Sequence, residues 1–186
     1  GRQVQHGWHS FSRVAPNRGW DKQVPGEGQA ELTMGRTWKV PLVQFAGLQT
    51  DALPSIGAGV GTLRDYAQTG LALRLGQGLG VDYGTARIRP GLSGGDGFND
   101  QKPLAWYVFL AVDGQLVGRD ALLDGEIFHD GVHVSHKPAV AELMAGVAVI
   151  WHGVRLSYTQ TWQSEEFNGQ KAGLFNFGSI SASARF

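Results

Sequence analysis

Apolar and polar residues alternate along most of the chain from about residue 29 onward. A period of two predicts β-strands, because successive side chains of a strand point to opposite faces. The segment Val154–Trp162 shows the pattern most cleanly, since one face carries Val154, Leu156, Tyr158 and Trp162 and the other carries Arg155, Ser157, Thr159 and Thr161. Glu31–Val40 and Leu71–Leu75 repeat the alternation, although Arg36 interrupts the apolar row of the first. We therefore expect an all-β protein.

The last strand of the chain indicates which solvent surrounds the sheet. Its apolar row is Ile180, Ala182, Ala184 and Phe186, and its polar row is Ser179, Ser181, Ser183 and Arg185. Alternation alone also fits a soluble β-sandwich binding module, which stays an alternative. Small hydroxyl side chains, however, are typical of a barrel interior, and a final strand that ends on phenylalanine resembles bacterial outer-membrane proteins. We therefore favour an antiparallel transmembrane β-barrel whose apolar side chains face lipid.

The connections between the predicted strands fall into two groups, short turns and long loops. Asp113-Gly114 and His152-Gly153 predict two-residue turns, the first between Leu104–Val112 and Leu116–Leu123 and the second between Ala139–Trp151 and Val154–Gln163. The long connections are Gln77–Pro103, Asp124–Lys137 and Glu165–Gly173. Short turns on one rim and long extracellular loops on the other are typical of outer-membrane barrels.

Aromatic side chains and strand parity extend this interpretation. Aromatic girdles are expected at strand ends, from Trp106, Tyr107, Trp151 and Trp162. Counting strands back from Phe186 places the segment before Glu31 on the rim of short turns, unless a further strand lies between Trp38 and Val60.

The first 24 residues lack alternation and contain the turn signal Pro16-Asn17-Arg18-Gly19. We divide the single domain 1-186 into a helical loop segment, 1-24, and barrel strands, 25-186, with a short helix from Arg2 to about Val14. On that helix Gln5 and His9 share one face, four positions apart. His9 could serve as a general base, since imidazole titrates near neutrality, and Gln5 could orient a water, a substrate oxygen or the imidazole. Taken alone, an ordinary helix with two surface histidines explains the pattern better.

Composition removes several classes of function. The chain of 186 residues has 16 basic and 16 acidic side chains and no basic cluster, so nucleic acid is not an expected partner. Cysteine is absent, which excludes disulfides and thiolate metal sites. No apolar run approaches the roughly 20 residues of a membrane helix.

Other polar residues offer weaker candidates for a site. His129, His133 and His136, with Asp130, could bind zinc, although strand spacing would scatter them and a solvated loop is favoured. Glu142 is expected to face the barrel lumen, because a carboxylate on the lipid face is costly. Asp96, Asn99 and Asp100 could touch a cation, but a plain glycine-rich loop is favoured.

The order of several motifs adds a resemblance to a known family. Gln5-xxx-His9 is followed by Gly19-Trp20-Asp21-Lys22-Gln23, and later segments continue the likeness: Leu71–Gly76, Arg87–Pro90, Leu123–Gly125, Lys137–Leu143 and Glu166-Phe167. Together they resemble the outer-membrane lipid A 3′-O-deacylases along essentially the whole chain.

That resemblance implies a site and a reaction. Members of the family are twelve-stranded barrels with an active site between the barrel wall and an extracellular helix, which supplies a histidine and, four positions before it, a glutamine. His9 and Gln5 match these places. By resemblance, His9 would activate water to attack an acyloxyacyl ester of lipid A, and a divalent cation, calcium in the family, would stabilise the oxyanion. The implied partners are lipopolysaccharide and outer-membrane lipids, and the implied state is a monomer in the bacterial outer membrane.

The chain also departs from the family. We count about eight strands of the twelve, so the family's N-terminal strands, with an Asn-Asp pair of the active site, have no counterpart. If the sequence were the whole molecule, its active site would be incomplete. The main alternative is therefore a non-catalytic, eight-stranded outer-membrane barrel with a structural or adhesive role.

Overall fold

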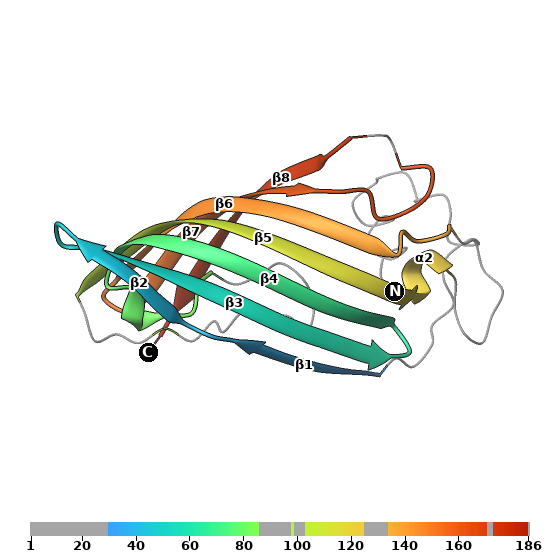
Figure 1. Ribbon diagram of the computed structural model, residues 1–186, viewed down its shortest axis with the longest axis horizontal. Coiled ribbons are helices and arrows are strands. Elements are labelled where there is room, and N and C mark those ends of the chain that lie inside the picture. The colour runs from blue at the N-terminus through green and yellow to red at the C-terminus, as the bar shows by residue number, and fades with distance from the viewer. Residues whose placement is uncertain (1–29, 86–97, 99–102, 125–133, 171–172, 186) are drawn as a thin grey trace, which may run out of the picture.

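The computed structural model of the protein describes residues 30–85, 98, 103–124, 134–170 and 173–185. Within these ranges the chain forms one antiparallel sheet (Figure 1) made of β1 (Glu31–Thr37), β2 (Val40–Phe45), β3 (Leu48–Gly61), β4 (Arg64–Gln77), β5 (Leu104–Asp120), β6 (Ala139–Trp151), β7 (Val154–Gln163) and β8 (Phe175–Ala184). Two short helical elements, η2 (Leu79–Val81) and α2 (Ala121–Asp124), join them. The expectation of about eight antiparallel strands is confirmed.

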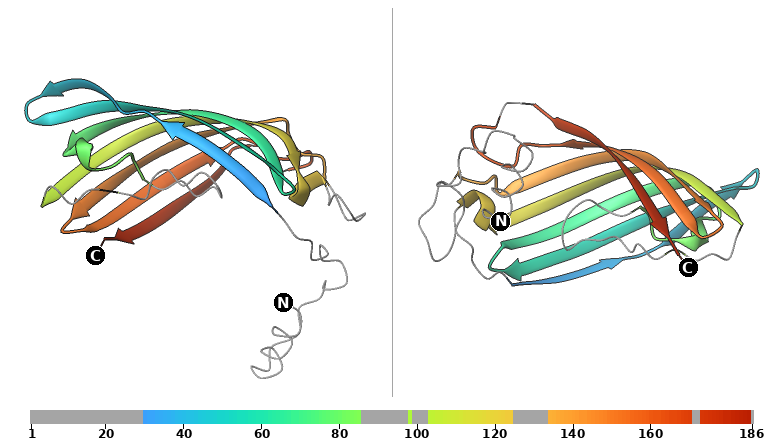
Figure 2. Two further views of the ribbon diagram at one scale, coloured as in Figure 1. Left: turned by 90° about the horizontal axis from the view of Figure 1, so that it is seen from below. Right: turned by 180° about the vertical axis from the view of Figure 1, so that it is seen from behind.

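The strands pair in the order β1-β3-β4-β5-β6-β7-β8, and β2 also pairs with β3. β1 lies against the Ser55–Gly61 half of β3, and β2 lies against the half that begins at Leu48. The expected strand Glu31–Val40 is therefore interrupted, and β1 and β2 share one edge of the sheet. Figure 2 shows that the sheet curves into a trough. No helix within the described ranges has both the length and the apolar character to cross a bilayer.

The two faces of the sheet have the reverse polarity of a water-soluble sheet. Along β7, the polar side chains of Arg155, Ser157 and Thr161 are buried on the concave face, while Val154, Leu156 and Tyr158 are exposed on the convex face. On β8, Ile180 has 83% of its surface exposed. The large exposed residues include Leu71, Leu73, Val108, Leu110, Val112, Leu143, Val147 and Val149. The predicted outward apolar row is thus confirmed for Ile180, Ala182 and Ala184, whereas Phe186 lies outside the described residues.

The two ends of the trough differ in their connections. One end, called the His152 rim, has the turns Ala46-Gly47 and His152-Gly153 and the end of β8. The other, called the Thr62 rim, has the turn Thr62-Leu63 and the connections β5–β6 and β7–β8. His152 and Gly153 both have positive φ, as a two-residue hairpin turn of type I′ requires, and that predicted turn is confirmed.

Two expectations about these connections and one about a side-chain direction were wrong. Asp113 and Gly114 are not a turn, because β5 runs unbroken through them and Asp113 is buried on the inner face. An inward position of a barrel accepts a carboxylate, so Asp-Gly loses its meaning as a turn signal there. β4 ends and β5 begins at the His152 rim, so the β4–β5 connection leaves and rejoins the sheet beside the short turns rather than opposite them. Tyr107, expected in an outer aromatic girdle, points inward and is 1% exposed.

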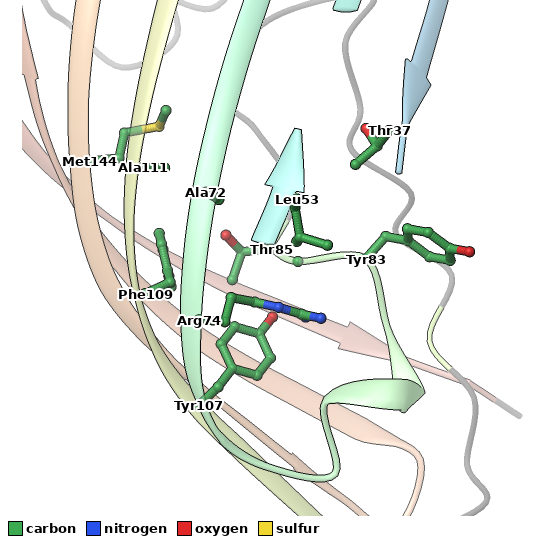
Figure 3. Close-up of a pocket in the computed structure, with 11 residues that line it drawn as sticks. Thr37, Leu53, Ala72, Arg74, Tyr83, Thr85, Tyr107, Phe109, Ala111 and Met144 are labelled. Atoms are coloured by element: carbon green, nitrogen blue, oxygen red, sulfur yellow. The ribbon is translucent and has the colours of Figure 1, made fainter. Parts of the chain in front are cut away.

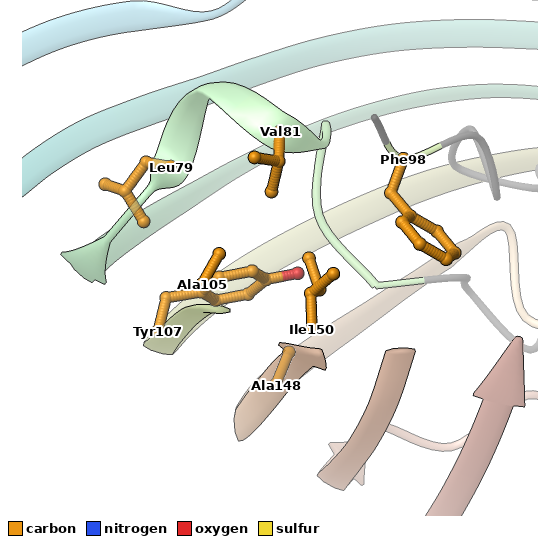
Figure 4. Close-up of a cluster of buried hydrophobic side chains, with 7 residues drawn as sticks. All are labelled: Leu79, Val81, Phe98, Ala105, Tyr107, Ala148 and Ile150. Carbon is orange, nitrogen blue, oxygen red and sulfur yellow. The ribbon is translucent and has the colours of Figure 1, made fainter. Parts of the chain in front are cut away.

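The hydrophobic core lies inside the trough at the His152 rim (Figure 4). Leu79, Val81 and Phe98 come from the β4–β5 connection and pack on the inner face of the strands, against Ala105, Tyr107, Ala148 and Ile150. The Gly78 backbone begins η2 in the left-handed region, with φ 76°, which glycine adopts without steric cost. This fold therefore fills one end of its interior with its own chain.

Candidate functional site

The predicted catalytic residues, Gln5 and His9, lie outside the described residues, but the structure shows where their segment joins the sheet. The Ala30 N–H donates to Thr62 Oγ1 at 2.9 Å, and the Thr62 N–H donates to the Ala30 carbonyl at 2.9 Å. The residues before Glu31 therefore meet the sheet at the Thr62 rim, with the long β5–β6 and β7–β8 connections. The strand count placed them on the rim of short turns unless a further strand lay between Trp38 and Val60. The structure has β2 between those residues, and it has a single strand β5 where the count used two.

The two long connections at the Thr62 rim are joined to each other. The Lys137 N–H donates to the Glu166 carbonyl at 2.7 Å, and the Asn168 N–H donates to the Ser135 carbonyl at 2.9 Å. The ammonium of Lys137 also lies 3.5 Å from the Glu165 carboxylate. Backbone hydrogen bonds of this kind give the rim a defined surface beside the point where the N-terminal segment enters.

His136 lies within this surface. Its Nδ1 is 2.6 Å from Asp124 Oδ1, and its Nε2 is 3.2 Å from the Val117 carbonyl oxygen. Because both ring nitrogens lie within hydrogen-bond distance of protein oxygens, neither is open to a metal ion. The expected solvated histidine is instead half-buried and paired, and His129 and His133 lie outside the described residues. Among the residues that the structure does describe, no three His, Cys, Asp or Glu side chains could together hold a metal ion.

Asp124 is the acidic partner of this pair. Burial raises the pKa of its carboxyl, but the hydrogen bonds from His136 and from the backbone N–H groups of Asp120 and His136 outweigh burial. The net effect holds the pKa of Asp124 below its ordinary value. The carboxylate therefore ties α2 to both β5 and the start of β6.

The inner wall carries a polar patch, made of Gln68, Asp113, Gln115, Glu142 and Gln163 on four neighbouring strands. Gln68 Nε2 donates to Asp113 Oδ1 at 2.6 Å, and Asp113 is in register with Glu142, which is in register with Gln163. Glu142 alternates with the buried Val140 and Met144, so the expectation that it faces the lumen is confirmed. Gln163 Nε2 in turn donates to Glu166 Oε1 at 2.6 Å in the β7–β8 connection.

The polar patch offers carboxamide groups, which donate and accept hydrogen bonds, and carboxylate groups, which accept them. Such groups suit the binding of a hydroxyl-bearing ligand better than covalent chemistry. The sequence signalled Glu142 alone, because recognition of the patch needs the register of four strands. The polar patch could have been predicted from polar residues at inward positions that pair with one another on successive strands.

A family model described as "Outer membrane protein LpxR" matches residues 1–186. The chain belongs to the LpxR family. Its location is therefore the outer membrane, and the expected membership of the lipid A deacylase family is confirmed. The apolar convex face is then the face that meets lipid.

A solved structure agrees with the LpxR assignment. LpxR from Salmonella typhimurium has the same fold, with a TM-score of 0.76 and 18% sequence identity, and the match covers 100% of this chain. The chain spans 62% of the length of that structure. No curated protein sequence matches the chain. The fold class is thus confirmed as the antiparallel sheet of the LpxR barrel.

Proposed function

We propose that the protein is an outer-membrane lipid A deacylase that hydrolyses an acyloxyacyl ester of lipid A, with His9 as general base and Gln5 as its support. The observation that carries the proposal is the LpxR family match, which spans Gln5, His9 and the described wall. The entry of the N-terminal segment at the Thr62 rim supports it, because that rim also bears β5–β6 and β7–β8, two of the three long connections expected on the extracellular side.

In this proposal each residue has one task. The imidazole of His9 takes a proton from water as the water oxygen attacks the ester carbonyl, and it then returns the proton to the leaving alkoxide. Gln5, one helical turn earlier, holds the imidazole or the water in place. The products are a fatty acid and a lipid A with one free hydroxyl.

A divalent cation, calcium by the family resemblance, belongs to the proposal as a requirement for activity. The described residues supply no set of three acidic or histidine ligands for it. Incubation of the intact protein with EGTA should abolish deacylation, and added Ca²⁺ should restore it. Full activity in EGTA would remove the cation from the proposal while leaving His9 in place.

The decisive experiment follows lipid A in bacteria that lack a deacylase of their own. The intact protein should remove one acyl chain, and His9→Ala should lower the rate by a factor of about 10²–10⁴, the usual contribution of a general base. His152→Asn is the matched control, because it changes a histidine on the opposite rim and asparagine tolerates its positive φ. Mass spectrometry of lipid A measures the result.

Two outcomes would contradict the proposal. Wild-type deacylation by His9→Ala would remove the histidine mechanism. Unchanged lipid A with the intact, folded protein would favour the alternative of a non-catalytic barrel with a structural or adhesive role.

A further inference from the structure

The convex face has a groove near the His152 rim, where β5 begins, β6 ends and β7 begins. The groove is called the outer groove and has a volume of about 380 Å³. The three strands lie side by side inside the sheet (Figure 1), away from the edges that β1, β2 and β8 form. The described residues that line the groove are all apolar: Pro103, Leu104, Val149, Trp151, Val154 and Leu156.

The register of the strands explains why these side chains meet. Leu104 pairs with Trp151, and Trp151 pairs with Val154, so these three residues form one row across the sheet. Val149 pairs with Leu156 in the row two residues closer to the middle of β6. All five side chains are exposed on the convex face. The outer groove is therefore bounded by two rows of apolar side chains from three strands.

A cavity on the inner face has a different character. It is lined in part by Arg74, Tyr83, Thr85 and Tyr107 and has a volume of about 50 Å³ (Figure 3). Guanidinium and hydroxyl groups line it, and since one water takes up roughly 30 Å³ of liquid, it has room for one or two waters. Among its described residues, the outer groove has only the indole N–H of Trp151 as a polar side-chain group. A water needs about two to four polar partners, so water does not suit the outer groove.

Hydrocarbon is the medium that surrounds the outer groove. The chain belongs to an outer-membrane family, and the convex face is its lipid face. An empty hollow in that face would leave its lining without contact atoms on one side, and the lost dispersion contacts add up over many atoms. An acyl chain restores these contacts. A chain in the groove touches side chains of β5, β6 and β7 at once, which a chain on a flat part of the face cannot do.

The position of the outer groove selects the kind of lipid. The groove adjoins the His152 rim, whereas the β5–β6 and β7–β8 connections lie at the Thr62 rim. Long connections of outer-membrane barrels face the outside of the cell, so the His152 rim faces the periplasm. The periplasmic leaflet of the outer membrane consists of phospholipid. Trp151 belongs to the aromatic girdle expected at that interface, which puts the groove within reach of the first part of a phospholipid acyl chain.

We propose that the outer groove binds one acyl chain of a phospholipid of the periplasmic leaflet and holds that lipid more tightly than the rest of the convex face holds its lipids. The site is separate from hydrolysis at His9, because the groove lies at the opposite rim. His9→Ala should therefore bind the phospholipid like the wild type, and failure of the proposed deacylase mechanism would leave this site in place.

The test is native mass spectrometry of the intact, delipidated protein in detergent after addition of palmitoyl-oleoyl phosphatidylethanolamine. The wild type should retain one phospholipid. Val149→Trp fills the groove with an indole ring and should lower the affinity about tenfold, the factor that goes with the lost burial of about two CH₂ groups. Val147→Trp is the matched control and should bind like the wild type. Val147 is the next convex residue of β6, is 40% exposed against 41% for Val149, and is not among the described lining residues.

A second pair of variants keeps the test decisive if Val149→Trp does not fold, with folding judged by heat-modifiable migration in gels. Trp151→Ala removes one side of the groove and should also weaken retention, whereas Trp162→Ala, on the same face of β7 near the other rim, should not. No retained phospholipid on the wild type would overturn the proposal. So would equal losses from both members of a folded pair, equal retention by both, or preferential retention of lipopolysaccharide when both lipids are offered.

Discussion

The pair of Asp124 and His136 shows how much one residue contributes at the Thr62 rim. The carboxylate accepts hydrogen bonds from the imidazole and from two backbone N–H groups. The sequence could identify His136 as a polar residue in a loop but not its partner, because the partner lies 12 positions away on a separate helix. The zinc role, which the sequence offered only as the weaker alternative, needs free ring nitrogens, and both ring nitrogens of His136 face protein oxygens.

A pH effect follows for Asp124, whose folded-state pKa is lowered. Its contribution to stability is fully present above the pKa of an unfolded aspartate, about 4. That contribution is lost as the pH falls through the lower folded pKa. Asp124→Asn should therefore destabilise the protein by roughly 1 kcal/mol at pH 7 and by progressively less below pH ~4.

Thermal unfolding in detergent at pH 7, 5, 4 and 3 measures the Asp124 effect. Glu165→Gln is the control, because its exposed contact with Lys137 should contribute little at any pH. A constant difference between Asp124→Asn and the wild type down to pH 3 would contradict the expectation.

At the level of strands, the alternation of side chains predicted the faces well but located the connections poorly. In β7 and β8 the period of two fixed which side chains point outward, because one face must be apolar. Asp113-Gly114 misled because a barrel interior tolerates aspartate inside a strand. Ala46-Gly47 escaped notice because alanine is not a turn residue, although Ala46 here has φ 48°. The polar patch escaped because it depends on pairing between strands.

Two glycines of the sheet should respond differently to the same substitution. A Cβ on Gly146 of β6 would meet the Tyr158 carbonyl and would lie 2.6 Å from Phe109 Cζ, whereas a Cβ on Gly114 of β5 would meet nothing within 4 Å. Gly146→Ala should therefore lower stability by roughly 1–3 kcal/mol through overpacking. Gly114→Ala should be neutral or slightly stabilising. Urea unfolding followed by tryptophan fluorescence compares them, and equal midpoints would contradict the packing described for β6.

On the scale of the whole molecule, the main feature is that the two faces of the sheet have the reverse polarity of a water-soluble sheet. Apolar residues cover the convex face of the trough, and buried Asp, Arg and Gln side chains line the concave face. The sequence could reveal this arrangement because apolar and polar residues alternate within each strand. It could not reveal that the β4–β5 connection folds back into the trough, since that depends on contacts with Lys39, Tyr107 and Arg155, which are far away in the sequence.

The reversal predicts opposite responses to an introduced charge. Val147→Arg places a guanidinium on the convex face near the middle of β6 and should cost roughly 2–4 kcal/mol. Ser179→Arg, at a similar height on the concave face of β8, should be tolerated because its side chain does not enter lipid. The folded fraction recovered in lipid vesicles, read from heat-modifiable migration, compares the two. Similar losses for both variants would mean that the convex face is not the lipid face.

The length of β5 bears on how the protein meets its surroundings. The strand has 17 residues, whereas about 9–11 suffice to cross the hydrocarbon of a bilayer when tilted by about 45°. Its exposed apolar side chains run from Leu104 to Leu116, so the surplus belongs to the Asp120 end. The four residues of β5 beyond Leu116, at ~3.3 Å each and tilted by about 45°, raise that end by roughly 9 Å. The headgroups of neighbouring lipids therefore touch a protruding wall from the side, and a lipid reaches the Thr62 rim by lateral diffusion without leaving its leaflet.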